Sequence, residues 1–222
     1  MSLHEESVAY RDKAKQMLGE KFNIFTSQIE ALTASGAAKR SAQAGQHAPD
    51  FTLPDAHGSA ISLSSLLAKG PVVLSFYRGE WCPFCNLELH AYQQVLPEIK
   101  ALGATLVAVS PEKPDLGLLA TEKNSLTFPV LSDLGNTVAR AYGLVFTTSP
   151  EVKALQQSAF QLSLPDRNGD ESWELPMPGT FVIDTQRIIR FAHVDPDYFA
   201  GRANPEEVLV TLRGIKESLV TA

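Results

Sequence analysis

The pattern of apolar and polar positions is clearest in residues 72–89, which read VVLSFYRGEWCPFCNLEL. Residues 72–77 are rich in β-branched and aromatic side chains, as is typical of a buried central strand. A polar turn at 78–80 follows, and apolar residues then recur at helical spacing as far as Ile99. Pro83 falls in the first turn of this expected helix, where a missing N–H is tolerated. The pattern predicts a strand, a turn and a helix in direct succession.

Short apolar runs and helical stripes alternate along the rest of the chain. The expected elements are strands at 51–53 and 60–63, a helical turn at 64–67, the strand at 72–77 with its helix from 83, a strand at 104–109, a helix at 115–124, a strand near 129–131, helices at 137–142 and 150–160, a solvated loop at 166–174, strands at 177–184 and 188–194, and a closing helix from 204. This succession predicts an α/β domain.

The N-terminal segment, residues 4–35, contains no proline and carries an apolar stripe with steps of four and three residues. The stripe consists of Leu18, Phe22, Phe25, Ile29 and Leu32. We expect a helical arm that lies on the core, with a homodimer contact as the alternative. Residues 35–45 are small and polar and predict a linker. The chain is therefore divided into an arm with linker, 1–44, and a main domain, 45–222.

Composition narrows the class of protein. The 222 residues are 44% hydrophobic and 20% charged, which is ordinary for a globular protein. The net charge of −6 argues against a nucleic-acid partner or an anionic membrane surface. No apolar stretch reaches the length of a membrane span, and the start, MSLHEESVAY, shows no secretory signal, so we expect a cytoplasmic protein.

The chain has two cysteines, Cys82 and Cys85, and both fall at the strand-to-helix junction. Free N–H groups and the dipole at a helix N-terminus stabilise a thiolate. Two intervening residues allow a disulfide across one helical turn, so one sulfur attacks while the other resolves. The spacing indicates redox chemistry.

Two other interpretations of the cysteines are inert buried thiols and half of a zinc site. Zinc normally requires four ligands, and the sequence contains no second cysteine pair. His47, His57 and His193 show no ligand spacing, and His90, five residues past Cys85, is expected on another face of the helix. We expect neither a metal nor a bound cofactor.

Six motifs together resemble the peroxiredoxin (AhpC/TSA) group of the thioredoxin-fold superfamily. They are APDFTLPD at 48–55, LSSL at 63–66, VVLSFYRGEWCPFC at 72–85, LVAVSPE at 106–112, FPVLSD at 128–133 and TFVID at 180–184. The resemblance covers about four fifths of the chain, from residue 45 to about 219. It implies a thioredoxin-like fold for 45–222, a central mixed β-sheet flanked by helices, preceded by the N-terminal helical arm.

The cysteine segment departs from the peroxiredoxin pattern. Laid on Cys85, that pattern places an acidic residue at Glu88, which matches, but its threonine position holds Cys82 and its proline position holds Arg78. The family's arginine before the late TFVID strand is replaced by Pro178. The missing cation near the thiols must come from another residue.

Other residues resemble thioredoxins instead. Trp81-Cys82-x-x-Cys85 resembles their WCxxC, and Pro178 resembles their cis-proline. This resemblance implies a cis peptide at Met177–Pro178, which offers backbone contacts to an extended cysteine-containing chain, with Trp81 shielding the disulfide. The chain is similar to a peroxiredoxin with a thioredoxin-type active site.

The resemblance implies an antioxidant thiol peroxidase that reduces hydrogen peroxide or organic hydroperoxides through a dithiol/disulfide cycle. Its disulfide is then reduced by an external thiol reductant such as thioredoxin or glutaredoxin/glutathione. In a peroxidase led by Cys85, Cys82 resolves; in the alternative, a protein disulfide oxidoreductase, Cys82 attacks and Cys85 resolves. A non-enzymatic redox sensor is the second alternative.

Four further residues are candidates for supporting roles at the thiols. Arg78 or Arg140 is expected to supply the cation. Glu88 lies one helical turn beyond Cys85, either beside it or on a solvated face. Thr180 either hydrogen-bonds in the site or caps its strand.

Overall fold

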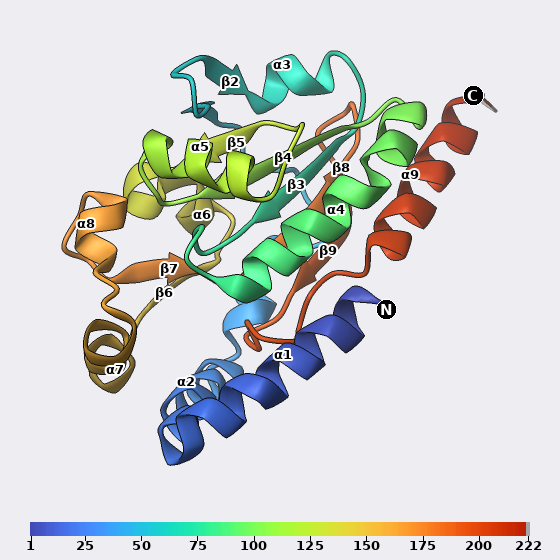
Figure 1. Ribbon diagram of the computed structural model, residues 1–222. Helices are drawn as coiled ribbons and strands as arrows, with labels where there is room; N and C mark the ends of the chain where they lie inside the picture. The colour runs from blue at the N-terminus through green and yellow to red at the C-terminus, as the bar shows by residue number, and fades with distance from the viewer. Residues whose placement is uncertain (221–222) are drawn as a thin grey trace.

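The computed structural model describes residues 1–220, and its centre is a five-stranded sheet in the order β5-β4-β3-β8-β9 (Figure 1). The strands are β3 (Val72–Phe76), β4 (Thr105–Ser110), β5 (Val130–Ser132), β8 (Gly179–Ile183) and β9 (Ile189–Val194). β3 is parallel to β4 and antiparallel to β8, so the sheet is mixed. The predicted α/β fold with a central mixed sheet is confirmed.

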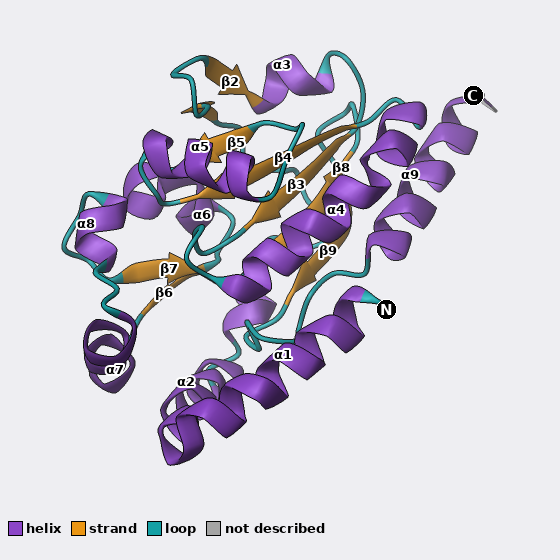
Figure 2. Cartoon of the chain, viewed as in Figure 1, coloured by secondary structure: helices purple, strands orange, loops and turns teal. Residues whose placement is uncertain are grey.

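Helices cover both faces of this sheet (Figure 2). They include α3 (Leu63–Leu67), α4 (Pro83–Ala101), α6 (Thr137–Ala141) and α9 (Pro205–Val220). Side chains alternate between the faces of a strand, so Val73 joins the core with α4 and α9, whereas Val72 and Leu74 join the core with α3 and α6. Because both faces are covered, β3 is buried along its whole length, as its sequence predicts.

The remaining elements lie around this core. They are β1 (Thr52–Pro54), β2 (Ala60–Ser62), α5 (Pro114–Lys123), a 3₁₀ turn (Leu134–Asn136), β6 (Val145–Thr147), α7 (Pro150–Phe160), α8 (Leu164–Asn168) and β7 (Glu174–Pro176). Among residues 1–220, no helix combines the length and the apolar character needed to cross a membrane.

The loop expected at 166–174 is wrong in part, because it contains the end of α8 and the start of β7. Ser163 caps α8 by accepting a hydrogen bond from the Asp166 N–H, and Gly169, in the left-handed region, ends it. β7 pairs with β6 in a two-stranded sheet. These elements are too short to leave a periodic signal in the sequence.

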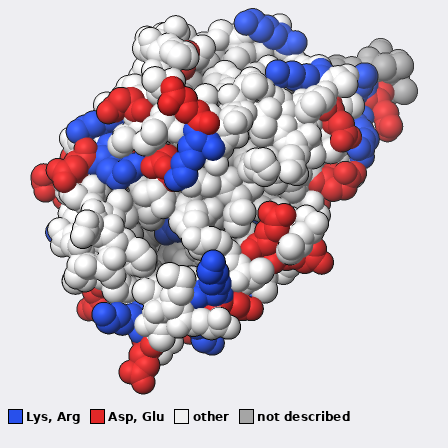
Figure 3. Space-filling model, in the orientation of Figure 1, with Lys and Arg blue, Asp and Glu red and all other residues white. Residues whose placement is uncertain are grey.

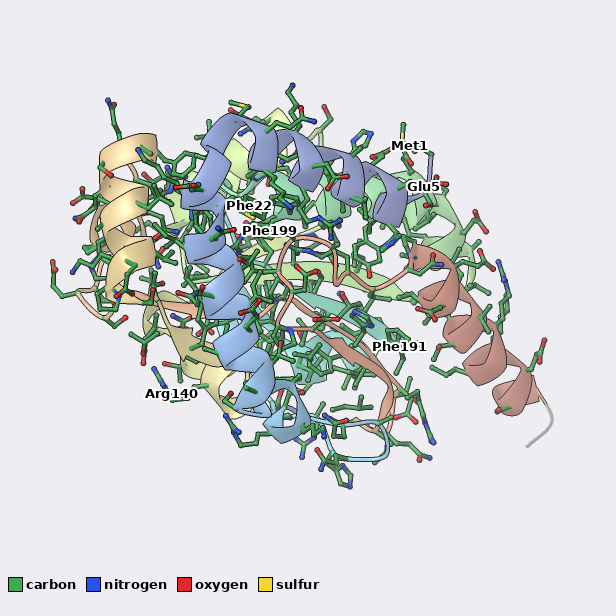
Figure 4. All side chains as sticks on the ribbon, turned by 90° about the horizontal axis from the view of Figure 1, so that it is seen from below. Met1, Glu5, Phe22, Arg140, Phe191 and Phe199 are labelled. Atoms are coloured by element: carbon green, nitrogen blue, oxygen red, sulfur yellow. The ribbon has the colours of Figure 1, made fainter. Side chains whose placement is uncertain are left out.

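The N-terminal segment forms two helices, α1 (Leu3–Leu18) and α2 (Phe22–Ala34), joined by a 3₁₀ turn at Gly19–Lys21. The positive φ of Gly19 ends α1, and the stripe residues from Phe22 onward lie on α2. The arm lies on the core: α1 packs against α4, and the rings of Phe22 and Phe199 stack 5.2 Å apart (Figure 4). The division into 1–44 and 45–222 stays a prediction, and residues 221–222 lie outside the described residues.

The segment expected as a linker is held at its C-terminal end. It contains a 3₁₀ turn, Ala37–Arg40, and the Ala42 N–H donates to the Tyr142 carbonyl over 2.9 Å. The Gly45 N–H donates to the carbonyl of Ile189 on β9 over 2.8 Å. Hydrogen bonds thus fix the end of this segment to β9 and to the residue that follows α6.

The cis peptide expected at Met177–Pro178 is wrong, since no peptide bond among residues 1–220 is cis. Pro178 bridges β7 and β8, and the Met177 N–H donates to the Leu144 carbonyl over 2.8 Å. The trans form is the default for an X-Pro bond, and the Met177–Pro178 bond between β7 and β8 keeps that form.

Candidate active site

The cysteines lie where the sequence places them, between the end of β3 and the start of α4 (Figure 1). Cys82 is the N-cap residue of α4, with extended backbone angles, and Pro83 is the first helical residue. Cys85 lies in the first helical turn. Both are free cysteines with fully buried side chains. The fold therefore places both thiols at the helix N-terminus, out of contact with bulk water.

Arg78 supplies a positive charge to Cys82. Its Nη2 lies 3.0 Å from the Cys82 Sγ, and its guanidinium carbon lies 4.0 Å from the ring centre of Tyr198 and 5.2 Å from that of Trp81. Burial acts to raise the pKa of Cys82, but a hydrogen bond from Cys85 and the charge of Arg78 outweigh it and hold this pKa well below the usual value. Cys82 is thus the thiol that ionises first.

Cys85 has the opposite tendency. Burial raises its pKa well above the usual value, and the neighbouring Cys82 raises it further. The Nη2 of Arg202 lies 3.6 Å from the Cys85 Sγ and opposes this shift. Each sulfur therefore has its own guanidinium, and the two pKa shifts favour ionisation of Cys82 over that of Cys85.

Arg202 also anchors a buried chain of hydrogen bonds. Its Nη1 donates to the Glu88 Oε2 over 2.7 Å, and both side chains are almost completely buried. The Thr180 hydroxyl donates to the Glu88 Oε1 over 3.4 Å, and the Tyr92 hydroxyl donates to Thr180 over 3.2 Å. Burial raises the pKa of Glu88 while the charge of Arg202 opposes the shift. The solvated position considered for Glu88 is thus wrong.

Sequence reasoning missed Arg202, which occupies the place of the expected cation near Cys85. It lies 117 positions beyond Cys85, in the segment before α9, and no motif marks it. Arg140, the other candidate, is exposed and pairs with Glu174 (Figure 4). The interpretation of Arg140 as a cation at the thiols is wrong.

The turn before Cys82 is held by a charged network. The Glu80 N–H donates to the Glu112 Oε2 over 2.6 Å, and Arg167 pairs with Glu80 over 2.8 Å and with Glu112 over 2.6 Å. Lys123 also pairs with Glu80. Arg167 comes from α8, in the segment that the sequence predicts as solvated loop. This network ties α8 to the turn that carries Arg78.

Pro178 and Trp81 flank the same region. Gly179 pairs with Phe76 at the end of β3, so Pro178 lies beside the turn that leads to the thiols. Trp81 is half-buried, under the guanidinium of Arg78. Among residues 1–220, no three His, Cys, Asp or Glu side chains are placed to hold a metal ion.

A cavity of about 570 Å³ lies beside the N-terminal end of α4, where the space-filling view shows a hollow with basic atoms inside it (Figure 3). Its walls come from α1, α2, α4 and α7, with Phe199 from the segment before α9. Trp81, Pro83 and Phe84, which flank Cys82, line its inner wall together with Arg78. The cavity therefore lies beside the turn that carries Cys82, and neither cysteine is among the described residues that line it.

Comparisons with known proteins agree with this geometry. Chloroplastic peroxiredoxin Q of Populus jackii is 30% identical over 183 residues, covering 74% of this chain and 83% of that protein. The thiol-disulfide oxidoreductase ResA of Halalkalibacterium halodurans is 36% identical over 104 residues, 46% of this chain and 58% of that protein. The crystal structure of peroxidoxin BcpB from Mycobacterium tuberculosis superposes with a TM-score of 0.62 at 28% identity, covering 78% of this chain and 97% of that one.

The family itself is settled by a match over most of the main domain. The model of the AhpC/TSA family matches residues 44–192, more than half of the 222-residue chain. That range contains β3, the CxxC turn, α4 and β8, whereas Arg202, which contacts Cys85, lies beyond it. The chain belongs to the AhpC/TSA family.

Proposed function

We propose that this chain is a thiol peroxidase in which Cys82 is the nucleophile and Cys85 the resolving thiol. One observation carries the proposal: the Arg78 Nη2 lies 3.0 Å from the Cys82 Sγ at the N-terminus of α4. A cation and a helix N-terminus both stabilise a thiolate, and the thiolate is the attacking species. Family membership and the peroxiredoxin relatives support peroxide as the oxidant.

The reaction balances with these groups. The Cys82 thiolate attacks one oxygen of the hydroperoxide, the O–O bond breaks, and the leaving alkoxide takes a proton to become an alcohol, or water when hydrogen peroxide is the substrate. Cys82 is left as a sulfenic acid. The Cys85 thiol attacks that sulfur, water leaves, and the Cys82–Cys85 disulfide forms. An external dithiol then reduces the disulfide and is itself oxidised.

Arg78 and Arg202 have different parts in this scheme. Arg78 stabilises the Cys82 thiolate and the negative charge that develops on the departing oxygen. Arg202 contacts Cys85 and favours its deprotonation when it attacks the sulfenic acid. The Nε of Arg78 and the Nε1 of Trp81 are buried donors without a protein acceptor among residues 1–220, and peroxide oxygens can accept from them.

A protein disulfide oxidoreductase is the second candidate function. The N-cap position of Cys82 and its low pKa fit thiol–disulfide exchange led by Cys82, and the ResA relative supports it over part of the chain. The trans Met177–Pro178 bond removes the argument for it that depended on a cis-proline. Peroxidase therefore remains the first candidate.

Stopped-flow mixing of the reduced protein with hydrogen peroxide, followed by the fluorescence of Trp81 and Trp173, tests this assignment. Cys85→Ser keeps the fast oxidation and accumulates a sulfenic acid that dimedone traps, whereas Cys82→Ser loses it. The reverse pattern assigns the attack to Cys85. Oxidation of the unaltered protein no faster than that of a free cysteine refutes the peroxidase, and insulin reduction then tests the exchange function.

The proposal also covers the reductant, the cellular compartment and the oligomeric state. The reductant is an external dithiol of the thioredoxin or glutaredoxin/glutathione type, and no bound cofactor takes part in the scheme. We also propose a cytoplasmic protein, where reduced thiols persist, and a homodimer as its assembly. Sedimentation of the reduced and the oxidised protein measures that assembly directly.

A further inference from the structure

The backbone of Glu80, between Arg78 and Cys82, is fixed from two sides. Its N–H donates to the Glu112 Oε2 over 2.6 Å, and its carbonyl accepts from the side-chain amide of Asn86, on α4, over 2.8 Å. An N–H that donates to an ionised carboxylate forms a stronger hydrogen bond than one between neutral groups. These two bonds leave little freedom to the turn that carries Arg78.

Glu112 reaches this turn from a distant part of the chain. It follows the end of β4, 32 positions after Glu80, and its side chain is fully buried. Its carboxyl carbon packs against Gly79, where a Cβ would lie 2.8 Å from it. Its Oε1 accepts from the Nε of Arg167, on α8, over 2.6 Å. Glu112 therefore connects the turn both to β4 and to α8.

The charges that meet at the turn balance one another. Glu80 and Glu112 are negative, Arg167 and Lys123 are positive, and ion pairs join the four into one cluster. Acidic and basic atoms are also interleaved on the surface over α5 and α8 (Figure 3). Opposite charges at short range largely cancel at a longer distance. The effect of this cluster on the thiols therefore depends on where it holds the turn and not on its net charge.

Arg78 depends on the turn for its position. Its Nη2 lies 3.0 Å from the Cys82 Sγ, whereas its Nε has no acceptor among residues 1–220. Its guanidinium also lies against the rings of Tyr198 and Trp81. A ring face, unlike a carboxylate, offers no single acceptor atom that would fix a guanidinium at one point. The backbone at 78–80 therefore sets the distance between the cation and the sulfur.

We propose that Glu112 is a positioning residue for the Cys82 thiolate, because its carboxylate holds the Gly79–Glu80 turn and so keeps Arg78 against the sulfur. Glu112 acts through the turn, and loss of its hydrogen bond to Glu80 lets Arg78 move away. A displacement of about 1 Å in a catalytic group can cost roughly 100-fold in rate. The proposal rests on the proposed peroxidase function for the rate of oxidation only, since the ionisation of Cys82 is measured without a peroxide.

Two substitutions of Glu112 separate its hydrogen bond from its charge. Glu112→Gln and Glu112→Leu both remove the negative charge, but the Gln oxygen can still accept from the Glu80 N–H. Loss of the charge alone favours a thiolate, so it would lower the Cys82 pKa equally in both variants. We expect a higher Cys82 pKa in Glu112→Leu than in Glu112→Gln or the unaltered protein, measured by absorbance at 240 nm against pH.

Equal Cys82 pKa values in the two Glu112 variants overturn the proposal. Glu30→Leu makes the same change at an exposed position on α2 and serves as the control. It should leave the titration of Cys82 unchanged.

Asn86→Ala tests the turn from the other side without changing any charge. It removes the donor to the Glu80 carbonyl, so the Cys82 pKa should rise as it does in Glu112→Leu. Asn23→Ala, at an exposed position on α2, is the matched control. Asn86→Ala also takes the place of Glu112→Leu if that variant does not fold. A Cys82 titration in Asn86→Ala identical to that of the unaltered protein contradicts the proposal.

Stopped-flow oxidation by hydrogen peroxide links the turn to the reaction. Glu112→Leu should slow oxidation roughly 10–100-fold, and Glu112→Gln much less. If Glu112→Leu loses stability in urea but keeps the titration and the oxidation rate of the unaltered protein, Glu112 has only a structural role and the proposal fails. If the unaltered protein reacts no faster than a free thiol while Glu112→Leu still raises the Cys82 pKa, the peroxidase fails and the positioning role stands.

Discussion

The guanidinium of Arg202 and the carboxylate of Glu88 form an ion pair of 2.7 Å inside the protein, although 114 positions separate them in the sequence. Arg202 also contacts Cys85, so the pair joins the segment before α9 to the helix that carries both thiols. A buried pair is costly to form, because both ions lose hydration, but breaking it leaves one unpaired charge in the interior.

Replacing Arg202 by Met should therefore lower the free energy of unfolding by about 3–5 kcal/mol. The Arg202→Met/Glu88→Leu double variant should recover much of this loss, since it removes both charges. Urea unfolding measures the free energy of unfolding of the single and the double variant. If Arg202→Met does not fold, Arg202→Lys, which keeps the charge, takes its place. Equal loss in the single and the double variant would contradict the pairing.

Arg202→Met should also change how the free energy of unfolding depends on pH. Burial already raises the pKa of Glu88, and loss of the Arg202 charge raises it further, because that charge opposes the shift. A carboxyl group with a raised folded-state pKa binds its proton more tightly in the folded than in the unfolded protein, so its contribution favours folding at low pH and is lost as pH rises. The stability difference between Arg202→Met and the unaltered protein should thus be smaller at pH 5.5 than at pH 8, as urea unfolding at both values will show.

Arg78 should control the ionisation of Cys82. Arg78→Met removes the cation, so the Cys82 pKa rises and the thiolate forms only at higher pH; thiolate absorbance at 240 nm follows the titration. The rate of peroxide oxidation at pH 7 should fall roughly 10²-fold, the typical cost of losing one such donor. Arg78→Lys should recover part of both effects, and Arg140→Met, at an exposed site, should change neither.

Gly79 is required by the geometry of the turn. Its φ is +149°, and a Cβ there would lie 2.4 Å from the Trp81 Nε1 and 2.8 Å from the Glu112 carboxyl carbon. Gly79→Ala should lower the free energy of unfolding by about 1–3 kcal/mol and shift the fluorescence of Trp81. Gly214→Ala, in α9 with open space around it, should instead stabilise the protein by about 0.5–1 kcal/mol. If Gly79→Ala unfolds at a higher temperature than Gly214→Ala, the turn relaxes to accommodate the added Cβ.

Arg167 should hold the turn before Cys82 in place. It pairs with Glu112, which accepts from the Glu80 N–H, so Arg167→Met leaves a buried carboxylate with one partner fewer. The loss of stability should be about 1–3 kcal/mol, and the Glu80 amide should exchange its hydrogen faster. An unchanged exchange rate would show that the Glu80–Glu112 contact persists without Arg167.

The strand, the turn and the CxxC helix could be predicted because local signals agree there: a β-branched run, a polar turn and a proline at the helix start. The N-cap position of Cys82 follows from those signals alone. Arg202 could not be predicted, since its contact with Cys85 depends on how the chain returns to the sheet 117 positions later. The same holds for Arg167, whose partners lie on the Cys82 turn and at the end of β4.

The helical arm is confirmed and its stripe packs on the core, but Gly19 divides the arm into two helices because glycine adopts a positive φ at low cost. The cis Met177–Pro178 bond came from resemblance to another branch of the superfamily, not from a signal in the residues themselves. Resemblance to known families therefore predicted the fold more accurately than it predicted individual backbone conformations.

Helices α1 and α2, which line part of the cavity, lie in a different part of the sequence from the thiols, and this has an evolutionary consequence. α1 and α2 precede residue 44, where the family match begins, whereas the thiols and Arg78 lie within it. Substitutions in the first thirty-four residues can therefore reshape one wall of the cavity while the thiols and Arg78 stay unchanged. Grafting the arm of another lineage onto this core would exchange that wall alone.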